Sequence, residues 1–278
     1  MTTRRLLIID PQNDFCDTPP ELRPAGVEPA LAVAGAHRDM LRLAEFIDKA
    51  GDSLERIVVT LDSHPFVAIE RVTFWLDAQG QQVAPFTQIT AADLQAGRFR
   101  PRFASAALQA KRVVQELERR GRPGLIVWPV HCVTGTWGHT LHRAVAQALN
   151  EWELRTGATV RKVLKGEYPM AEHYGVFEAE TPTMLAESTL FNEALADSLS
   201  FGVDELLVAG EASSHCVAAS VDQLVRHRRG DATGITLLTD CMSPVTGFKA
   251  AADAFLVRAH AAGAELSTSA ALLAGCGR

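Results

Sequence analysis

Cys216 has the residue type and the position of a catalytic nucleophile. It ends the segment Gly-Glu-Ala-Ser-Ser-His-Cys (residues 210–216), which leads into a long helical pattern. Ser213 or Ser214 is the expected N-cap, so the thiol would lie in the first helical turn. The helix dipole and the free amides there lower the pKa of a thiol and can hold an oxyanion. A buried structural cysteine is the alternative, but the turn before Cys216 favours the nucleophile.

Asp10 and Lys165 could supply the acid–base chemistry that such a thiol needs. Asp10 ends an apolar run, where an isolated carboxylate would be costly to bury and therefore requires a partner. A structural ion pair between Asp10 and Lys165 would satisfy that requirement by itself. Beside a thiol, however, Asp10 can act as general base and later as acid, while Lys165 maintains the charge and orientation of the group.

Asp62, His64 and His131 form a second group, of the types that bind a transition metal. Residues i and i+2 of an extended segment point to the same side, so Asp62 and His64 can converge on one ion. One carboxylate and two imidazoles suit zinc, iron or manganese. A hydrogen bond between Asp62 and His64 explains that pair equally well, and the addition of His131 favours the metal.

Alternating strand and helix patterns indicate the fold that positions these residues. The strand candidates are nearly continuous apolar runs, as expected for parallel strands that are covered on both faces. Their alternation with helices implies right-handed crossovers and an α/β fold, three-layer αβα with a central, mostly parallel six-stranded sheet. The predicted strands are residues 5–9, 56–61, 124–128, 159–164, 205–209 and 234–239, and the predicted helices are residues 36–49, 105–120, 139–152, 188–201, 214–229 and 248–262.

The candidate residues all follow the carboxyl ends of predicted strands. In an open parallel sheet these ends line the crevice where ligands bind, so we expect the side chains to meet in one site. In chain order, Asp10 follows the first strand, Asp62 and His64 follow the second, His131 lies three residues beyond the third, Lys165 follows the fourth, and Cys216 opens the helix after the fifth.

One segment, about residues 65–102, interrupts the alternation of strands and helices. It carries turn residues, a polar stretch and several aromatics, and we interpret it as an insertion near the mouth of the site. The chain contains no linker rich in proline, glycine or serine, which predicts a single domain over residues 1–278. The aromatic residues that could form an interface or a lid are Phe66, Phe74, Trp75, Phe86 and Phe99.

The composition excludes several other classes of protein. The 47% hydrophobic and 22% charged residues are ordinary for a globular chain, and the formal net charge of −6 gives no general attraction to nucleic acid or to an anionic membrane. No apolar run approaches the length of a signal peptide or a membrane span. The odd number of cysteines, five, argues against a secreted disulfide framework and favours the cytoplasm.

The segments around the candidate residues form five motifs in a fixed order: residues 9–16, 62–64, 128–136, 165–166 and 210–217. Together they resemble the motifs of nicotinamidases, which are isochorismatase-like cysteine hydrolases. The resemblance extends over about residues 5 to 245. It implies the isochorismatase-like hydrolase fold, a homo-oligomer and a place in NAD salvage.

The resemblance also implies roles for individual residues. Asp10, Lys165 and Cys216 would be the catalytic triad. A cis peptide bond is expected between Glu211 and Ala212, and the backbone amides of Ala212 and Cys216 would then form the oxyanion hole.

Further implied roles concern the substrate ring and the metal. Phe15 and Trp128 would contact the ring, and a divalent metal, Zn²⁺ or alternatively Fe²⁺ or Mn²⁺, would be bound by Asp62, His64 and His131. Many relatives carry a further histidine after the Asp-x-His motif, whereas residues 65–71 contain none. Glu70 could replace that ligand, water could fill the position, or the affinity for metal could be lower.

The sequence therefore predicts an amide hydrolase that acts on nicotinamide or a similar heteroaromatic carboxamide, a small-molecule substrate. The alternative is a related cysteine amidase for a carbamoyl or ureido compound. A vinyl-ether hydrolase of the isochorismatase type would need neither Cys216 nor the Asp-x-His motif. A non-catalytic scaffold is disfavoured by the intact triad, and nothing in the sequence supports binding of nucleic acid.

Overall fold

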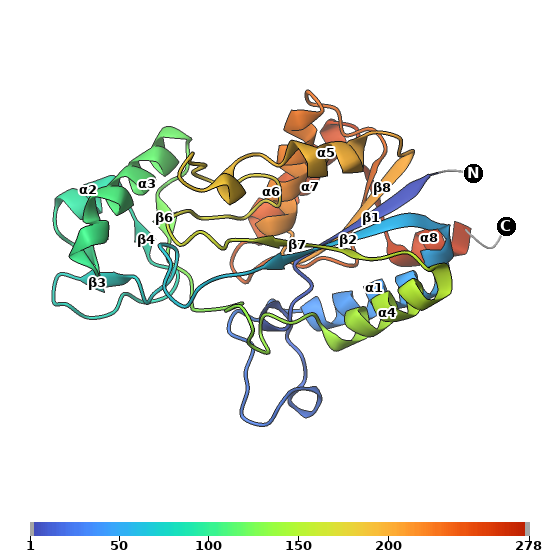
Figure 1. Ribbon diagram of the computed structural model, residues 1–278, viewed down its shortest axis with the longest axis horizontal. Coiled ribbons are helices and arrows are strands. Elements are labelled where there is room, and N and C mark those ends of the chain that lie inside the picture. Colours follow the sequence, from blue (N-terminus) through green and yellow to red (C-terminus); the bar gives the residue numbers. More distant parts are fainter. Residues whose placement is uncertain (1–2, 276–278) are drawn as a thin grey trace.

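The core of the fold is a six-stranded sheet in which every pairing is parallel. The computed structural model describes residues 3–275, so Cys276 lies outside the described part. Figure 1 shows the strands running side by side, with the two ends of the chain near each other. In spatial order the strands are β10 (Glu265–Ser267), β9 (Ile235–Leu238), β8 (Glu205–Gly210), β1 (Arg4–Ile9), β2 (Leu54–Asp62) and β7 (Arg161–Lys165).

Helices cover both faces of the sheet, which confirms the predicted three-layer α/β fold (Figure 1). On one face lie α1 (Ala36–Ala50), α4 (Arg143–Thr156) and α8 (Ser269–Gly275). On the other lie α5 (Glu193–Ser200), α6 (Cys216–His227) and α7 (Lys249–Ala261). Each layer has its own apolar core against the sheet. Within residues 3–275, no helix combines the length and the hydropathy needed to cross a bilayer.

The burial of β1 and α1 explains why these elements form where the sequence predicts them. Residues 6–9 of β1 are at most 1% exposed, as a central strand covered on both faces requires. In α1, Met40, Leu43 and Ile47 are fully buried at helical spacing and form the face that packs on the sheet. The neighbouring α4 is fixed by Trp152, whose indole N–H donates to the Gly51 carbonyl at 2.9 Å.

Two features of the central sheet differ from the prediction. Residues 124–128 do not form its third strand. Their apolar character reflects burial in a separate core, where β6 (Leu125–Ile126) pairs antiparallel with β4 (Gln88–Ile89). The sixth strand is instead the edge strand β10, which pairs with β9. It is only three residues long and mostly exposed, so it lacks the apolar run on which the prediction depended.

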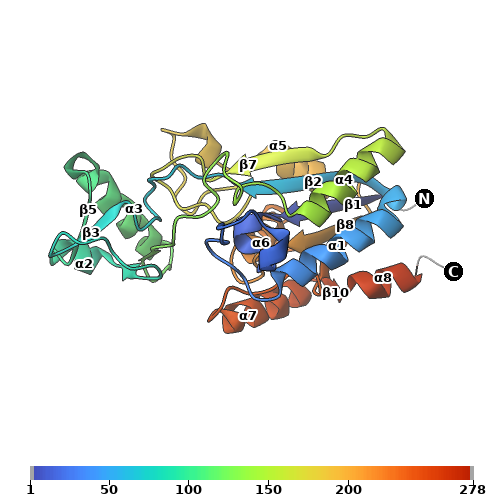
Figure 2. The same cartoon turned by 90° about the horizontal axis from the view of Figure 1, so that it is seen from below.

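Residues 67–127 form a lobe at one end of the molecule, which we call the accessory lobe (Figures 1 and 2). It contains the β4–β6 pair and an antiparallel pair of β3 (Trp75–Asp77) and β5 (Phe99–Pro101), with α2 (Ala91–Gln95) and α3 (Ala107–Arg119). Phe74 and Trp75 are buried in its core and so form neither an interface nor a lid.

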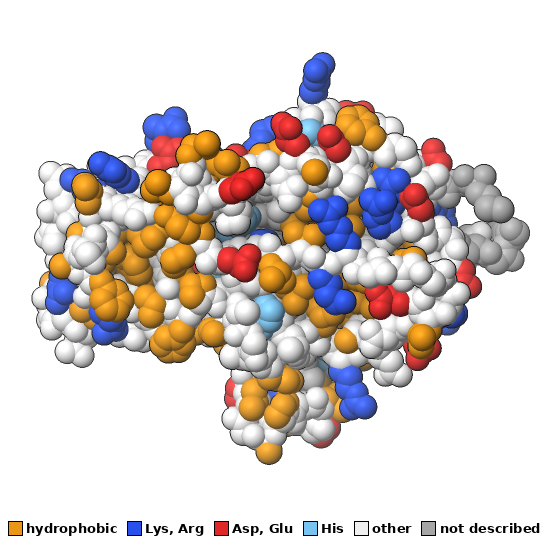
Figure 3. All heavy atoms as spheres, viewed as in Figure 1, with side chains coloured by type: hydrophobic (Ala, Val, Ile, Leu, Met, Phe, Trp, Pro, Cys, Tyr) orange, Lys and Arg blue, Asp and Glu red, His pale blue; other side chains and the backbone are white. Residues whose placement is uncertain are grey.

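The surface of the accessory lobe is rich in apolar side chains. In the space-filling view, hydrophobic side chains gather over this end of the molecule, whereas charged groups are more frequent over the sheet (Figure 3). The exposed large apolar residues in and next to the accessory lobe include Phe66, Phe86, Phe103 and Leu108.

Single-turn 3-10 helices occur in the connections of the fold, at Asn13–Phe15, Pro20–Leu22, Gly51–Ser53, Ala104–Ala106 and Glu187–Thr189.

Candidate active site

The carboxyl ends of neighbouring strands bring Asp10, Asp62 and Lys165 together. Asp10 directly follows β1, while Asp62 and Lys165 are the last residues of β2 and β7 and pair in register. Cys216 opens α6, which follows β8 on the other side of β1. All four side chains are buried. The strand order thus places the predicted triad and one predicted metal ligand at a single edge of the sheet.

Lys165 lies at the centre of this group. Its ammonium is 2.9 Å from Asp10 Oδ2, 2.7 Å from Asp62 Oδ1 and 3.7 Å from Cys216 Sγ. Burial opposes its charge, but the two carboxylates outweigh burial and raise the pKa of Lys165 well above its usual value. Lys165 therefore stays positively charged and contacts both Cys216 and Asp62 of the predicted metal cluster.

Asp10 and Cys216 both hold their protons more tightly than usual. Burial raises the pKa of Asp10, and Lys165 opposes this shift. Burial also raises the pKa of the Cys216 thiol well above its usual value; Lys165 lowers it, while Asp10 and Asp62 raise it. The expectation of a lowered thiol pKa is therefore wrong for the free protein, because burial and the two carboxylates outweigh the start of the helix.

The turn before Cys216 has the geometry expected from the sequence motif. The peptide bond between Glu211 and Ala212 is cis, as predicted. The Ala212 carbonyl accepts from the amides of His215 at 3.0 Å and Val217 at 3.2 Å. Among residues 3–275, the amides of Ala212 and Cys216 donate to no protein acceptor. Both N–H groups are thus free to receive a ligand oxygen.

The predicted serine N-cap is wrong. His215 occupies the N-cap position of α6, and its side chain makes no capping hydrogen bond. Ser214 Oγ instead lies 2.8 Å from His215 Nδ1 and accepts from the Val245 amide at 3.1 Å. The serine therefore orients the imidazole, which lines the pocket beside Cys216.

A buried pair of carboxyl groups supports the turn from behind, a feature that the sequence did not predict. Glu211 is fully buried, and its Oε2 accepts from the Ser243 amide at 3.1 Å. Ser243 also donates its hydroxyl to Asp39 of α1. Burial and the nearby Asp39 raise the pKa of Glu211 well above its usual value. A single sequence offers no signal for this pairing, because Asp39 and Glu211 are far apart in the chain.

Asp62, His64 and His131 do converge into a cluster that could bind a metal. Their ligand atoms lie within 4.8 Å of one another, and all three side chains are buried. Asp62 Oδ2 is 2.8 Å from His64 Nε2 and 3.4 Å from His131 Nε2. Both rings bond to backbone carbonyls through Nδ1, at 3.0 Å to Gly166 and 2.9 Å to Pro129, which turns both Nε2 atoms toward Asp62. The donor set and its orientation fit a divalent cation.

His131 reaches the cluster by a route that differs from the prediction. It does not follow a strand of the central sheet, but lies in the segment that leaves the accessory lobe after β6. A parallel bridge between His64 and Val133 ties this segment to the end of β2. Burial, and to a smaller extent the charge of the nearby Arg71, lowers the pKa of His131 to about 4, so its imidazole is neutral at pH 7.

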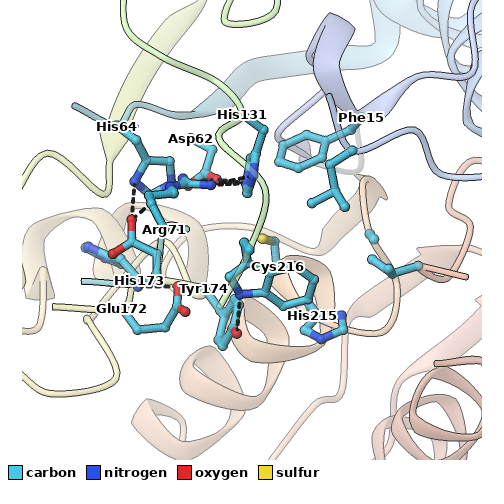
Figure 4. A pocket seen from close by; sticks show the side chains of 15 residues that line it. Phe15, Asp62, His64, Arg71, His131, Glu172, His173, Tyr174, His215 and Cys216 are labelled. Carbon is cyan, nitrogen blue, oxygen red and sulfur yellow. Dashed lines mark hydrogen bonds and ion pairs between the residues drawn. The ribbon is translucent and has the colours of Figure 1, made fainter. Parts of the chain in front are cut away.

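Glu70 and Arg71 lie behind and beside the histidines. Glu70 Oε1 is 3.2 Å from His64 Nδ1, on the side of the ring away from Asp62, and Glu70 is not one of the three residues of the cluster. Arg71 Nη1 contacts both ring nitrogens of His131, at 3.0 Å for Nε2, as Figure 4 shows. Arg71 was not among the predicted site residues, although it falls in the stretch that lacks a further histidine.

Cys216 and the three residues of the cluster line one pocket with an empty volume of about 410 Å³. The predicted aromatics Phe15 and Trp128 both line it (Figure 4). The ring of Phe15 lies 5.2 Å from that of His131, and Trp128 donates its indole N–H to the Tyr174 hydroxyl at 2.9 Å. The pocket is therefore apolar and aromatic, with the thiol and the cluster in its wall.

Three consecutive residues of the pocket were not predicted as site residues. Glu172, His173 and Tyr174 come from the loop after β7, which carries no regular element to suggest their position. Burial, and to a smaller extent the charge of Glu70, raises the pKa of Glu172 to about 8. Burial, and to a smaller extent the charge of Lys165, lowers the pKa of His173 to about 3. Both side chains are therefore predominantly uncharged at neutral pH.

The sequence matches no family model and no curated protein sequence. Solved structures, in contrast, match almost the whole chain. The fold is that of isochorismatase-like hydrolases, and its relatives among solved structures include nicotinamidases and a pyrazinamidase.

Three of these relatives illustrate the similarity. The yeast nicotinamidase Pnc1p is 19% identical, with a TM-score of 0.59, and the match covers 95% of this chain and 99% of the other. The nicotinamidase of Acinetobacter baumanii is 18% identical, with a TM-score of 0.61 and coverages of 98% and 99%. The pyrazinamidase of Pyrococcus horikoshii, solved in complex with zinc, is 19% identical, with a TM-score of 0.51 and coverages of 95% and 98%. At these identities the similarity establishes the fold.

Proposed function

We propose that this protein is a cysteine amidase that hydrolyses nicotinamide or a similar heteroaromatic carboxamide to the acid and ammonia. The observation that carries the proposal is the contact of Lys165 with both Asp10 and Cys216, whose thiol lies in the wall of an aromatic pocket. The fold supports it, because solved structures with this fold include nicotinamidases.

In the first half of the proposed reaction, Asp10 accepts the thiol proton as the Cys216 sulfur attacks the carboxamide carbon. The carbonyl oxygen becomes an oxyanion, which the free amides of Ala212 and Cys216 stabilise. Lys165 remains charged beside both groups and offsets the negative charge that develops when the thiol is deprotonated.

In the second half, Asp10 returns the proton to the leaving nitrogen, and ammonia departs from an acyl-thioester on Cys216. Asp10, again a carboxylate, then takes a proton from a water molecule that attacks the thioester carbon. The carbon–sulfur bond breaks, the thiol regains its proton, and the acid is released. Asp10 is suited to both roles because burial raises its pKa, which makes the carboxylate a stronger base for the proton that it accepts and later returns.

Phe15 and Trp128 would hold the substrate ring between their apolar surfaces. Asp62, His64 and His131 would bind a divalent metal, Zn²⁺ in the first place and Fe²⁺ or Mn²⁺ as alternatives. A bound ion would supply a positive centre for the ring nitrogen. Glu70 would support the cluster through His64 Nδ1 rather than as a direct ligand.

We also propose that residues 1–278 form a single hydrolase domain with an insertion at about residues 65–102, which contributes to the accessory lobe, and that the protein works as a cytoplasmic homo-oligomer in NAD salvage. The apolar surface of the accessory lobe supports self-association. Sedimentation of the purified protein tests this part: a monomer at micromolar concentration would contradict it.

Ammonia release from nicotinamide tests the main proposal. The wild-type protein, supplied with zinc, should release ammonia, and Cys216→Ala should abolish the release. Cys241→Ala is the matched control, because Cys241 is also buried but does not line the pocket. A folded wild-type protein that releases no ammonia from nicotinamide or pyrazinamide, with or without metal, would contradict the proposal.

A carbamoyl or ureido compound is the second candidate substrate. The observation that favours it is Arg71, whose guanidinium can donate to a carbonyl or carboxylate oxygen where a ring nitrogen would otherwise bind. The same ammonia assay distinguishes the two classes. Turnover of an acyclic carbamoyl compound at least tenfold faster than that of nicotinamide would favour the second candidate.

A further inference from the structure

The guanidinium of Arg71 lies against the metal-type cluster from a fully buried position. Its Nη1 contacts both ring nitrogens of His131, Nδ1 more closely, and is 3.0 Å from Nε2, which is also 3.4 Å from Asp62 Oδ2. Because His131 Nδ1 donates to the Pro129 carbonyl at 2.9 Å, the lone pair of the ring is on Nε2. Arg71 therefore lies within hydrogen-bond distance of the nitrogen through which His131 would bind a metal.

A metal ion and this guanidinium cannot use His131 at the same time. An ion bound through Nε2 would lie against the guanidinium, because Arg71 Nη1 is 3.0 Å from that nitrogen. A dication and a guanidinium at this distance also repel each other strongly in a buried pocket. Binding of a metal at this site thus requires Arg71 to leave His131.

The pocket offers Arg71 a second position. Arg71 Nε is already 3.1 Å from Glu70 Oε1. Among residues 3–275, Arg71 Nη2 and Glu172 Oε2 are buried polar atoms without a hydrogen-bond partner, and both residues line the same pocket. A rotation toward Glu70 and Glu172 would give the guanidinium carboxyl partners and free His131.

We propose that Arg71 is a built-in competitor of the divalent metal for His131, and that it supplies the positive charge facing the substrate while no metal is bound. The inference deepens the proposed function and relies on its assignment of Asp62, His64 and His131 as the metal ligands. Removal of the guanidinium should therefore tighten metal binding, whereas loss of a buried residue normally weakens a site.

Zinc affinity measured by competition with a chromophoric chelator tests the proposal. Arg71→Met keeps the length of the side chain and removes its charge, and it should bind Zn²⁺ on the order of a hundredfold more tightly than the wild type, the scale at which neighbours of ligands act. Arg71→Lys, which keeps the charge but has a shorter reach, should lie between the two. Arg100→Met, at an exposed arginine of the accessory lobe, is the matched control and should match the wild type.

Two further experiments secure the interpretation. Arg71→Met/His131→Ala should lose the gain, which would place the tighter zinc at this cluster. Crystals of the wild-type protein grown with and without zinc need no variant and remain informative if Arg71→Met fails to fold. With zinc at the cluster, the Arg71 guanidinium should have left His131.

The outcomes separate this inference from the amidase proposal. Equal zinc affinity of the wild type and Arg71→Met, or a zinc-bound structure with Arg71 still on His131, would overturn the competition and leave the metal site intact. Absence of zinc binding by the wild type and the folded variant would overturn the competition and the metal site together. None of these results depends on ammonia release, which tests the thiol chemistry separately.

Discussion

The two sides of the pocket are built in different ways. The side that we propose as the nucleophile side consists of Cys216, which lines the pocket at the start of α6, with Lys165 and Asp10 in contact with one another at the ends of β7 and β1. The cation side consists of His131, Glu70, Arg71 and Glu172, all from irregular segments, together with Asp62 and His64 at and just after the end of β2. A rigid sheet fixes the first side, whereas loops packed between the sheet and the accessory lobe form the second.

The difference indicates which side of the pocket should tolerate substitutions better. The nucleophile side is held by strand register, such as the pairing of Asp62 with Lys165, so a change there disturbs the whole edge of the sheet. On the cation side, a substitution in a loop does not disturb the pairing of the strands. Arg71, which contacts His131, lies in such a loop, in the stretch that lacks a further histidine. We therefore expect substitutions on the nucleophile side to have the larger effects.

The largest effect should come from Asp10→Asn. The amide cannot accept the thiol proton, and general acid–base groups contribute about 10²- to 10⁴-fold to a rate, so kcat for the best amide should fall on the order of a thousandfold. Steady-state kinetics measures the loss. Glu70→Gln removes a buried carboxylate on the cation side and should cost less than about tenfold, since Glu70 touches no reacting atom in the proposed mechanism.

Asp48→Asn, at an exposed position of α1, is the control for the loss of one negative charge. Its kcat should equal that of the wild type. An equal loss of kcat in Asp10→Asn and Glu70→Gln, with both proteins folded, would contradict the division between the two sides.

Lys165→Met should have the largest effect on stability. It leaves Asp10 and Asp62 buried without their shared cation, and breaking a buried ion pair by removing one partner costs about 3–5 kcal/mol. Denaturant unfolding at pH 7 measures the change in the free energy of unfolding. Lys162→Met is a matched control in the same strand, where the side chain is exposed, and should change stability by less than about 0.5 kcal/mol. A similar small change in Lys165→Met would show that the carboxylates do not need the ammonium.

The nucleophile side was also the part of the site that the sequence could predict. The sequences of β1, β2 and β8 contain continuous apolar runs, and β7 has the shorter apolar pair Val163-Leu164. The residues that end these strands could therefore be placed at one edge of the sheet from their order in the chain. The edge strand β10 was missed because its three residues are partly exposed and lack such a run. Residues 124–128 carry the pattern of a buried strand but belong to the accessory lobe, since an apolar run does not reveal which core buries it.

The cation side could be predicted only in part. Asp62 and His64 follow from the i, i+2 rule, and His131 was found although the strand assigned before it was wrong. Arg71 and Glu172 could not be found, because irregular backbone gives no periodicity from which to infer the direction of a side chain. The thiol pKa was predicted in the wrong direction for a related reason: burial and neighbouring charge depend on tertiary contacts, not on the start of a helix.

Glu172→Gln should change how stability depends on pH on the cation side. Burial, with Glu70 next, raises the pKa of Glu172 from 4.5 to about 8 in the folded protein. Between these two values the unfolded chain releases a proton that the folded protein retains, so this residue makes stability fall as pH rises through that window. The glutamine cannot titrate, so the variant should gain stability relative to the wild type as pH increases.

Thermal unfolding followed from about pH 4.5 to pH 8 measures this difference. Glu167→Gln, at an exposed glutamate in the same loop, is the control and should give a curve parallel to that of the wild type. If the curve of Glu172→Gln is also parallel, Glu172 titrates in the same way in both states and its burial does not hold the proton.

The smallest effect should come from Tyr174→Phe, at the aromatic wall that faces both sides of the pocket. The Tyr174 hydroxyl accepts the indole N–H of Trp128 at 2.9 Å, and its removal leaves that donor unpaired beside the substrate ring. One such neutral hydrogen bond is worth about 1 kcal/mol, so KM should rise about fivefold while kcat stays unchanged. Tyr168→Phe is the matched control, because Tyr168 accepts from Gln109 outside the pocket and should leave both constants as they are. A fall in kcat with an unchanged KM would place the Tyr174 hydroxyl in the chemical step. The aromatic wall would then contribute a functional group of its own, in addition to those of the two sides.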